Sequence, residues 1–375
     1  MTKKLLISLT LFDRQPEEAM NTTDWNQLRG LPLTEWKPQS QLRLPATELL
    51  RGATHCIDVH NHLGRWLSNG EWMINNVDAL LAMMDEHSVD AIVNLDGMWA
   101  DEVTANVERY DHAHPGRFYT FCQLEWARLA EPDGVATLIA SLDNSLSRGA
   151  RGLKVWKNLG LNVLDADGSV ILPDDPRVIE IIAHAGEIGL PVLIHTADPK
   201  AFFEPLDERN ERLDELLQER DWWFGDASRY PQFSRLMDAL HTLVLACPGT
   251  RFVGAHAGCA AEDLDLVESL LSRAPNFAID IAGRMAELGR QPRRFAALVN
   301  RFPDRVLFGT DIYPIIGEQY SLHYRFLESA DEAFDYSPEN EIPPQGRWTV
   351  SGLALDPALL PAIYRGNAER FLGLV

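Results

Sequence analysis

The sequence predicts an α/β protein, a (β/α)8 TIM barrel with an N-terminal arm and long insertions after the fifth and eighth strands. Three observations predict this fold: eight short apolar runs, helix-length amphipathic segments between most of them, and His or Asp at the ends of several runs. Eight strands that alternate with helices are typical of a parallel barrel. A doubly wound open sheet is the competing fold, but the strand count disfavours it and no GxGxxG follows the first strand.

The first part of the chain, residues 1–54, has no regular pattern. Pro32, Pro38 and Pro45 interrupt any long helix or strand in it. We expect this segment to be an arm that wraps the main domain. The remaining residues, 55–375, are expected to form a single barrel domain.

The candidate strands are short apolar runs with β-branched residues, of a length that suits strands buried on both faces. They span His55–Val59, Ala91–Leu95, Phe118–Leu124, Gly152–Trp156, Pro191–Ile194, Arg251–Ala255, Phe277–Ile281 and Val306–Phe308. Helices are predicted where apolar residues recur with a period near 3.6. These segments include Val77–His87, Val135–Leu146, Val178–Ile188, Phe233–Leu245 and Leu264–Leu271.

Two connections are too long to be simple turns. One runs from Thr196 to about Tyr230 after the fifth strand, and the other from Tyr313 to about Leu355 after the eighth. The first contains a charged segment, Asp207–Arg220, that predicts an exposed helix with paired charges. In a barrel both insertions would lie over the carboxyl ends of the strands, where barrel enzymes carry out catalysis.

The composition excludes several classes of function. The chain has 375 residues with 34 basic and 55 acidic side chains, a net charge of −21, which disfavours binding to nucleic acid or to an anionic membrane. No uncharged apolar stretch approaches the roughly 20 residues that cross a membrane, and the apolar run Leu5–Phe12 is expected to be a short strand rather than a secretory signal. Four cysteines without a CxxC argue against a disulfide scaffold or a cysteine zinc site. We therefore expect an acidic cytoplasmic protein.

The strongest local motif is DVHNH at residues 58–62, at the end of the first candidate strand. Side chains alternate along a strand, so His60 and His62 are expected to face the same side, which is a metal-chelating arrangement. A second HxH pair, His112 and His114, follows a helix and precedes a proline. Its rings are expected to diverge, and we interpret it as structural.

Three further polar residues lie at strand ends. His195 ends the fifth candidate strand, His256 ends the sixth, and Asp311 follows the eighth. Any one of them alone is more often a hydrogen-bonded buried residue than a ligand. Four strand ends that all carry metal-ligand residue types indicate a metal site at the mouth of the barrel. Imidazoles and one carboxylate leave a divalent ion with net positive charge, which promotes ionisation of water near neutral pH.

The motifs resemble those of the amidohydrolase superfamily. More narrowly, the chain is similar to the amidohydrolase-2 branch, which includes aminocarboxymuconate-semialdehyde decarboxylase and its relatives. The resemblance covers residues of about 55 to 375. It rests on DVHNH at 58–62, IHT at 194–196, AHAG at 255–258, GTD at 309–311 and YRGNAERFLGL at 364–374.

The resemblance implies one divalent metal ion, with zinc favoured and manganese as the alternative. By position, the ligands it implies are His60, His62, His195 and Asp311. It also implies that His256 is the general acid/base or the electrostatic partner of the water or substrate. Asp311 is assigned a catalytic role as well, because a carboxylate beside the ion can take a proton from water.

The fourth candidate strand carries Lys154. Binuclear members of the superfamily use a carbamylated lysine on this strand to bridge two metals, but the resembled branch is mononuclear, so we assign Lys154 to binding a substrate carboxylate. Lys157 is interpreted as a solvated cation at the strand end. Many branch members have His-Pro after this lysine, whereas this chain has Trp156 and Lys157, which leaves the substrate open.

Aromatic and basic residues near the predicted mouth bear on the substrate. Six tryptophans fall there, Trp66, Trp99, Trp126, Trp156, Trp222 and Trp223, and about half are expected only to pack loops onto the barrel. We assign Trp66, Trp99 and Trp156 to a pocket for a flat or ring-shaped ligand. Arg65 and Arg284, with Lys154, indicate an anionic substrate.

Three functions are consistent with these residues. The first is a metal-dependent hydrolase that acts on a lactone, ester or amide of a small anionic ring compound through a metal-activated water. The alternative is a non-oxidative decarboxylase or hydratase with the same mononuclear site, because both chemistries use the same ligands. A non-catalytic binding barrel is disfavoured, since a site that no longer catalyses a reaction is expected to have lost at least one of its metal-ligand residues. The expected partner is a small-molecule substrate, and homo-oligomers are common among such barrels.

Overall fold

The computed structural model describes residues 28–32, 35–36, 38–313 and 315–375. The chain divides into two compact units, Met1–Arg43 and Leu44–Val375. The short strand expected at Leu5–Phe12 lies outside the described residues. In the second unit, residues just before the first strand are tied to the barrel domain, because Thr47 N donates to the Asp331 carboxylate (2.6 Å).

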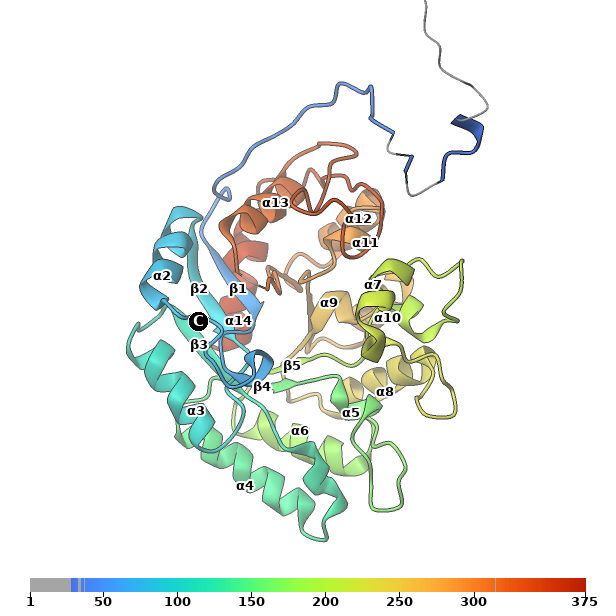
Figure 1. Ribbon diagram of the computed structural model, residues 1–375. Helices are drawn as coiled ribbons and strands as arrows, with labels where there is room; N and C mark the ends of the chain where they lie inside the picture. The colour runs from blue at the N-terminus through green and yellow to red at the C-terminus, as the bar shows by residue number, and fades with distance from the viewer. Residues whose placement is uncertain (1–27, 33–34, 37, 314) are drawn as a thin grey trace, which may run out of the picture. The chain divides into compact units, whose positions relative to one another are not determined.

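The second unit contains eight parallel strands, hydrogen-bonded in the order β1 to β8, with helices between and around them (Figure 1). The strands are β1 (Cys56–Asn61), β2 (Val89–Asn94), β3 (Phe118–Cys122), β4 (Gly152–Val155), β5 (Val192–Ile194), β6 (Phe252–Gly254), β7 (Phe277–Asp280) and β8 (Val306–Leu307). Two backbone hydrogen bonds join β1 to the residues that directly follow β8. Val59 N donates to Phe308 O (3.1 Å), and Asp311 N donates to His60 O (2.8 Å). The barrel is therefore nearly closed.

The α-helices connect or flank these strands. They are α2 (Val77–Glu86), α3 (Asp101–Asn106), α4 (Gly134–Ser147), α5 (Asn158–Leu161), α6 (Pro176–Glu187), α7 (Leu213–Gln218), α8 (Phe233–Ala246), α9 (Ala255–Gly258), α10 (Leu264–Arg273), α11 (Met285–Leu288), α12 (Pro292–Arg301), α13 (Gly317–Glu328) and α14 (Asn367–Leu372). Shorter 3-10 or π segments are η1 (Trp66–Ser68), η2 (Val107–His112), η3 (Trp126–Ala130), η4 (Lys200–Phe203), η5 (Arg220–Trp222) and η6 (Ala362–Gly366).

The prediction of a TIM barrel is confirmed, and each of the eight expected strands lies within a few residues of an observed one. The five predicted helices correspond to α2, α4, α6, α8 and α10. The helix expected at Asp207–Arg220 is wrong in extent, because only α7 is α-helical there. Arg212, expected on an exposed helix face, is fully buried against Glu287, so packing and not local charge pairing fixes this segment.

Local chemistry accounts for where several helices begin. Asp175 caps α6 by accepting a hydrogen bond from Arg177 N, and Pro176 occupies the first turn, where its missing N–H costs nothing. Asn76 caps α2 by accepting from Ala79 N (3.0 Å). These helices bury one apolar face against the strands.

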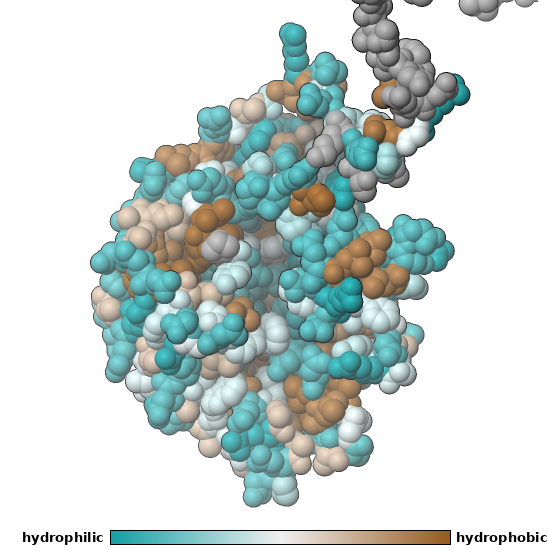
Figure 2. Space-filling model, viewed as in Figure 1, coloured by the Kyte–Doolittle hydropathy of each residue, from teal (hydrophilic) through white to brown (hydrophobic). Residues whose placement is uncertain are grey.

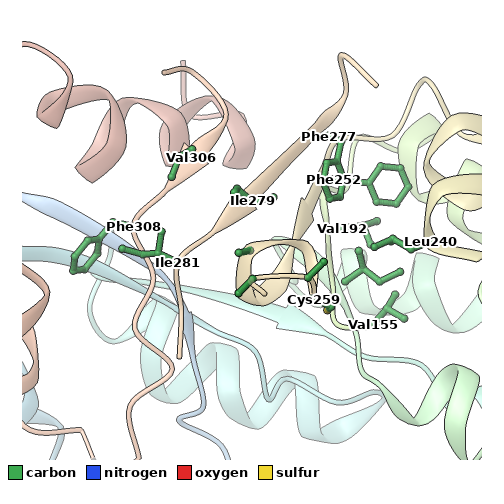
Figure 3. Close-up of a cluster of buried hydrophobic side chains, with 14 of the residues drawn as sticks. Val155, Val192, Leu240, Phe252, Cys259, Phe277, Ile279, Ile281, Val306 and Phe308 are labelled. Carbon is green, nitrogen blue, oxygen red and sulfur yellow. The ribbon is translucent and has the colours of Figure 1, made fainter. Parts of the chain in front are cut away.

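Two hydrophobic layers hold the barrel together. An outer layer packs side chains such as Phe252, Phe277 and Phe308 between strands and helices (Figure 3). An inner layer fills the barrel with residues such as Val59 and Leu193 and is joined by Phe371 from the C-terminal helix. Among the described residues, no helix is long and apolar enough to cross a membrane.

Candidate metal centre

Three histidines surround the carboxylate of Asp311 at the carboxyl ends of the strands. Oδ1 of Asp311 lies 3.7 Å from Nε2 of His62, and Oδ2 lies 3.9 Å from Nε2 of His60 and 3.7 Å from Nε2 of His256. Donor atoms of His60, His256 and Asp311 all lie within 4.8 Å of one another. The tertiary structure thus brings together residues from β1, the end of β6 and the segment after β8. Among the described residues this set contains His256 but neither His62 nor His195, which the resemblance implied as ligands.

A buried carboxylate orients each histidine of the HxH motif. Nδ1 of His60 lies 2.8 Å from Oδ2 of Asp280, and Nδ1 of His62 lies 2.6 Å from Oδ1 of Asp96. A carboxylate on Nδ1 fixes the tautomer in which Nε2 carries no proton and can bind a metal. Sequence reasoning missed both carboxylates, although each lies at the end of a strand, β7 for Asp280 and just beyond β2 for Asp96.

The backbone at His256 and Asp311 is left-handed, with φ of 59° and 52°. Non-glycine residues rarely adopt this conformation, and such strain is often found at functional sites. Two contacts hold it in place, because Asp280 Oδ1 accepts from His256 N (2.7 Å) and His60 O accepts from Asp311 N (2.8 Å). Asp280 therefore organises two histidines at once, through its two oxygens.

A second buried carboxylate, Asp58, fixes the strand end that carries Asp311. It accepts hydrogen bonds from Thr310 N (3.1 Å), from the Thr310 hydroxyl (2.5 Å) and from the hydroxyl of Tyr320 on α13 (2.8 Å). Burial raises the pKa of Asp58 to about 6, although these donors favour the charged form. The network links β1 to the residue that precedes Asp311.

The ring of His195 contacts the ring of His256, with the two ring centroids 4.4 Å apart. Its Nε2 is buried, lies 3.4 Å from Oδ1 of Asp198 and makes no hydrogen bond in the described part of the chain. Asp198 in turn forms an ion pair with Lys157, so the interpretation of Lys157 as a solvated cation is wrong. Its ammonium also lies 5.2 Å from the ring centroid of Trp222.

Burial and charge set the protonation of the cluster. Burial lowers the pKa of His60 and of His256 well below the usual value, and it lowers the pKa of His195 to about 4. Burial also lowers the pKa of His62, but Asp96 outweighs it and the net pKa is raised. Burial raises the pKa of Asp311, but electrostatic attraction to the surrounding histidines and to Lys154 lowers it overall. The site thus offers neutral imidazoles at His60, His195 and His256 and an ionised carboxylate at Asp311, whereas Asp96 favours the charged form of His62.

Lys154 of β4 is fully buried inside the barrel, and its Nζ lies 3.2 Å from Nε2 of His60. Burial lowers the pKa of Lys154 to about 8, even though Asp311 and Asp280 favour its charged form. The side chain faces the same cluster as the histidines.

The tryptophans near the predicted mouth of the barrel differ in their surroundings. Trp66 lies beside the cluster, with its ring 6.4 Å from His62 and 4.5 Å from Trp156. Trp99 is half-buried, and its ring contacts no other ring among the described residues. Trp126, by contrast, is buried in the hydrophobic core.

The two arginines expected to bind an anion have protein partners. Arg65 donates to both carboxylate oxygens of Glu102 and lies 4.9 Å from the ring centroid of Trp72. Arg284 is buried and donates from Nη1 to the carbonyl of Gly283 (2.8 Å). Arg65 is thus paired with a carboxylate, whereas the one hydrogen bond of Arg284 leaves other N–H groups of its guanidinium able to donate.

Two cavities adjoin the histidine and aspartate cluster. One of about 280 Å³ lies beside His62 and is lined mostly by apolar side chains, among them Ile74 and Met83. The other, about 500 Å³, includes Asp311 and His323 in its wall. Figure 2 shows this face of the molecule hollowed near its middle, with hydrophilic residues around much of the depression.

Comparisons with known proteins concern nearly the whole second unit. A family model described as Amidohydrolase matches residues 57–374. No curated protein gives a significant match to the sequence.

Several solved structures share the fold. 2,6-Dihydroxybenzoate decarboxylase from Rhizobium is 15% identical with a TM-score of 0.54, and the match covers 86% of this chain and 99% of that one. Dihydroxybenzoic acid decarboxylase from Polaromonas sp. JS666, solved with bound manganese and 2-nitroresorcinol, is 14% identical with a TM-score of 0.54, over 86% and 97% of the two chains. An amidohydrolase from Burkholderia multivorans, solved with bound zinc, is 14% identical with a TM-score of 0.52, over 85% and 99%.

Proposed function

The chain belongs to the amidohydrolase family, as its motifs indicated, and on that premise we propose that it is a metal-dependent hydrolase of small ring compounds. The observation that supports this most directly is the convergence of three Nε2 atoms on the Asp311 carboxylate. In this proposal His60, His62, His195 and Asp311 hold one divalent ion, and His256 moves a proton. The bond broken belongs to a lactone, ester or amide.

The donor set fits a divalent metal such as zinc or manganese. His60 and His62 each have Nδ1 engaged by a carboxylate, which leaves Nε2 as the metal-binding atom. Imidazole and carboxylate donors suit zinc, and carboxylate-containing sites also accept manganese. The buried Nε2 of His195 makes no hydrogen bond of good geometry among the described residues, although Oδ1 of Asp198 lies 3.4 Å away.

When bound, the metal ion would act as a Lewis acid and lower the pKa of water. Asp311, ionised and 29% exposed, would accept a proton from the attacking water. His256 is held through Nδ1, which donates to the carbonyl of Ala282 (2.8 Å), so that Nε2 is free to accept and return a proton. Lys154, inside the cluster, would donate a hydrogen bond to the substrate carbonyl oxygen.

The hydrolytic step balances with these groups alone. A bond forms between the water oxygen and the carbonyl carbon, and the bond from that carbon to the leaving oxygen or nitrogen breaks. One water proton passes to Nε2 of His256, directly or by way of Asp311, and His256 then delivers that proton to the leaving atom. Both groups have suitable protonation states at neutral pH, one ionised and one neutral.

The test combines metal content with product analysis. Protein purified without added metal and without a His tag is examined by plasma mass spectrometry, and about one zinc or manganese per chain is expected, with loss of both metal and activity in His60→Ala. Reactions run in water labelled with heavy oxygen are expected to place the label in the product acid. Release of carbon dioxide without label incorporation would identify a decarboxylase instead. Absence of metal even after reconstitution would overturn the metalloenzyme proposal.

A further inference from the structure

A further cavity, of about 580 Å³, lies apart from the metal centre and is built mainly by the insertion that follows β5. Its wall combines the ends of η4, residues between 224 and 234 that lead into α8, and residues between 262 and 266 at the start of α10. None of its described lining residues belongs to either cavity beside the metal centre. Because its volume is within the range of small-molecule sites, the cavity has room for a second ligand.

Four aromatic rings form a continuous row in the wall of this cavity. The centroid of the Phe203 ring lies 5.7 Å from that of Phe233 and 5.4 Å from that of Phe224. The ring of Phe224 in turn lies 5.1 Å from the ring of Tyr230. Phe203, Tyr230 and Phe233 are only half-buried, so packing in the core does not account for this row, whereas a ligand would cover the rings.

Hydrogen bonds within the insertion hold two members of this wall in place. Phe224 N donates to Phe202 O (2.8 Å), which fixes the ring of Phe224 beside η4. Nε1 of Trp223 donates to Glu204 O (3.0 Å), which fixes the backbone at Glu204. The wall is therefore formed without a ligand, and this lowers the entropy that ordering of the insertion would cost on binding.

Carboxylates outnumber cations in the same wall. The described lining residues include three carboxylates, Glu204, Glu262 and Asp263, and one ammonium, that of Lys200, which is exposed. Oε1 of Glu262 accepts from Lys200 N (3.0 Å), whereas its Oε2 accepts no hydrogen bond from the described residues. Burial raises the pKa of Glu262, because its charge is poorly solvated, and a cation beside it would stabilise that charge.

Two of the rings already attract cations of the protein itself. The guanidinium carbon of Arg229 lies 4.9 Å from the centroid of the Tyr230 ring, and Nζ of Lys157 lies 5.9 Å from that of Phe224. Aromatic faces bind alkylated ammonium ions well, because these cations are bulky and weakly hydrated. Aromatic rings together with an excess of carboxylates are therefore complementary to an alkylated ammonium group and unfavourable to an anion.

We propose that this cavity binds a small organic cation that carries a methylated ammonium group, with the aromatic row against the methyl groups and with Glu204 and Glu262 as the opposite charges. A free molecule is favoured over a lipid headgroup, because a chain with a net charge of −21 attracts free cations but is repelled by anionic membranes. The site is independent of the proposed hydrolase, since none of the residues assigned to the metal centre lines the cavity.

Binding is measured by calorimetry with choline and two compounds of the same skeleton. The first, 3,3-dimethylbutan-1-ol, is the uncharged isostere of choline, and the second, ethanolamine, carries a smaller and more strongly hydrated ammonium group. We expect choline to bind in preference to each of them by roughly tenfold, as contacts with the rings and carboxylates predict. Phosphatidylcholine vesicles are expected not to retain the protein on co-sedimentation, and retention would overturn the assignment to a free cation.

Variants connect that preference to the cavity. In Glu262→Gln the amide oxygen can still accept from Lys200 N, and Glu204 is exposed, so Glu262→Gln and Glu204→Gln are expected to fold. Each is expected to weaken choline binding by roughly fivefold, with little change for the uncharged isostere. Tyr230→Leu, which removes one ring, should weaken choline more than the isostere. Glu208→Gln, at an exposed position of the same insertion outside the cavity wall, is the matched control.

The location of the bound cation is tested with the metal centre disabled. His60→Ala is expected to bind choline as the wild type does, because the cavity shares no lining residue with that centre. Loss of choline binding in His60→Ala would assign the cation to the metal centre and overturn the proposal. Equal affinity for choline and its uncharged isostere, absence of choline binding at millimolar concentrations, or choline binding that Glu262→Gln, Glu204→Gln and Tyr230→Leu all leave unchanged would also overturn it.

Discussion

The carboxylate of Asp280 is the most informative single group to change in this site. It is fully buried, Oδ2 lies 2.8 Å from Nδ1 of His60, and Oδ1 accepts from the backbone N–H groups of His256 (2.7 Å) and Ala282 (3.1 Å). In Asp280→Asn the amide oxygen can keep both backbone hydrogen bonds. The amide nitrogen, however, is a donor where an acceptor of the His60 Nδ1–H is needed.

This exchange acts through the tautomer of His60. To accept from an amide N–H, Nδ1 must lose its proton, and the proton moves to Nε2, the atom that faces Asp311. A protonated Nε2 cannot bind a metal ion. Loss of such an orienting carboxylate costs about 10- to 100-fold in metal affinity or activity, which corresponds to roughly 1.4 to 2.7 kcal/mol.

The assay is calorimetric titration of apo-protein with zinc, with circular dichroism to confirm the fold. Asp111→Asn is the matched control. Asp111 accepts from Thr120 N (2.9 Å) and from the Thr120 hydroxyl (2.6 Å) through different oxygens, so an asparagine can keep the first bond and donate its amide N–H to the hydroxyl in place of the second. We expect the control to bind zinc as the wild type does. If Asp280→Asn bound zinc with unchanged affinity, the carboxylate would not control the tautomer and the reasoning would fail.

Three further predictions concern the site and the fold. His256→Ala is expected to keep its metal and lose turnover, and loss of metal, measured by plasma mass spectrometry, would make His256 a ligand. Glu287→Gln is expected to lower the free energy of unfolding in urea by about 3 kcal/mol, because it removes one of the two carboxylates paired with the fully buried Arg212. The control Asp207→Asn breaks an ion pair with the exposed Arg209 and should change stability by less than about 0.5 kcal/mol. Burial raises the pKa of Asp331, but donation from Thr47 and Arg325 lowers it below its usual value, so its contribution is present above pH of about 4 and is lost as the pH falls through the folded-state pKa. Asp331→Asn should accordingly lower Tm at pH 7 and have little effect near pH 2, and an equal loss at both would contradict this assignment.

Much of the fold and the cluster of site residues could be predicted from the sequence alone. The strands were recognisable because burial on both faces requires continuous apolar runs, and that requirement is local. His60, His62, His195, His256 and Asp311 were recognisable because each interrupts or ends such a run at the carboxyl end of a strand. Parallel strands bring those ends to one rim, so position in the sequence implied proximity in space.

The partners of these residues were decided only by tertiary structure. Asp280 lies 220 positions from the His60 that it orients, and no local pattern links the two. Arg65 and Lys157 were interpreted as available cations, but folding placed Glu102 and Asp198 against them. Arg212 was expected on an exposed helix, yet the insertion buries it against Glu287.

The sequence by itself determined which side chains gather at the mouth of the barrel, since residue type and strand position carry that information. Only the tertiary structure decided which tautomers, charges and acceptors those side chains present. The cavity beside Asp311 is an example, because its wall includes residues of α13 and residues between 336 and 345, which have no apolar periodicity to place them. The physical reason is that hydrogen bonds and ion pairs depend on atoms that are distant in sequence, whereas strand and helix formation depend mainly on neighbours.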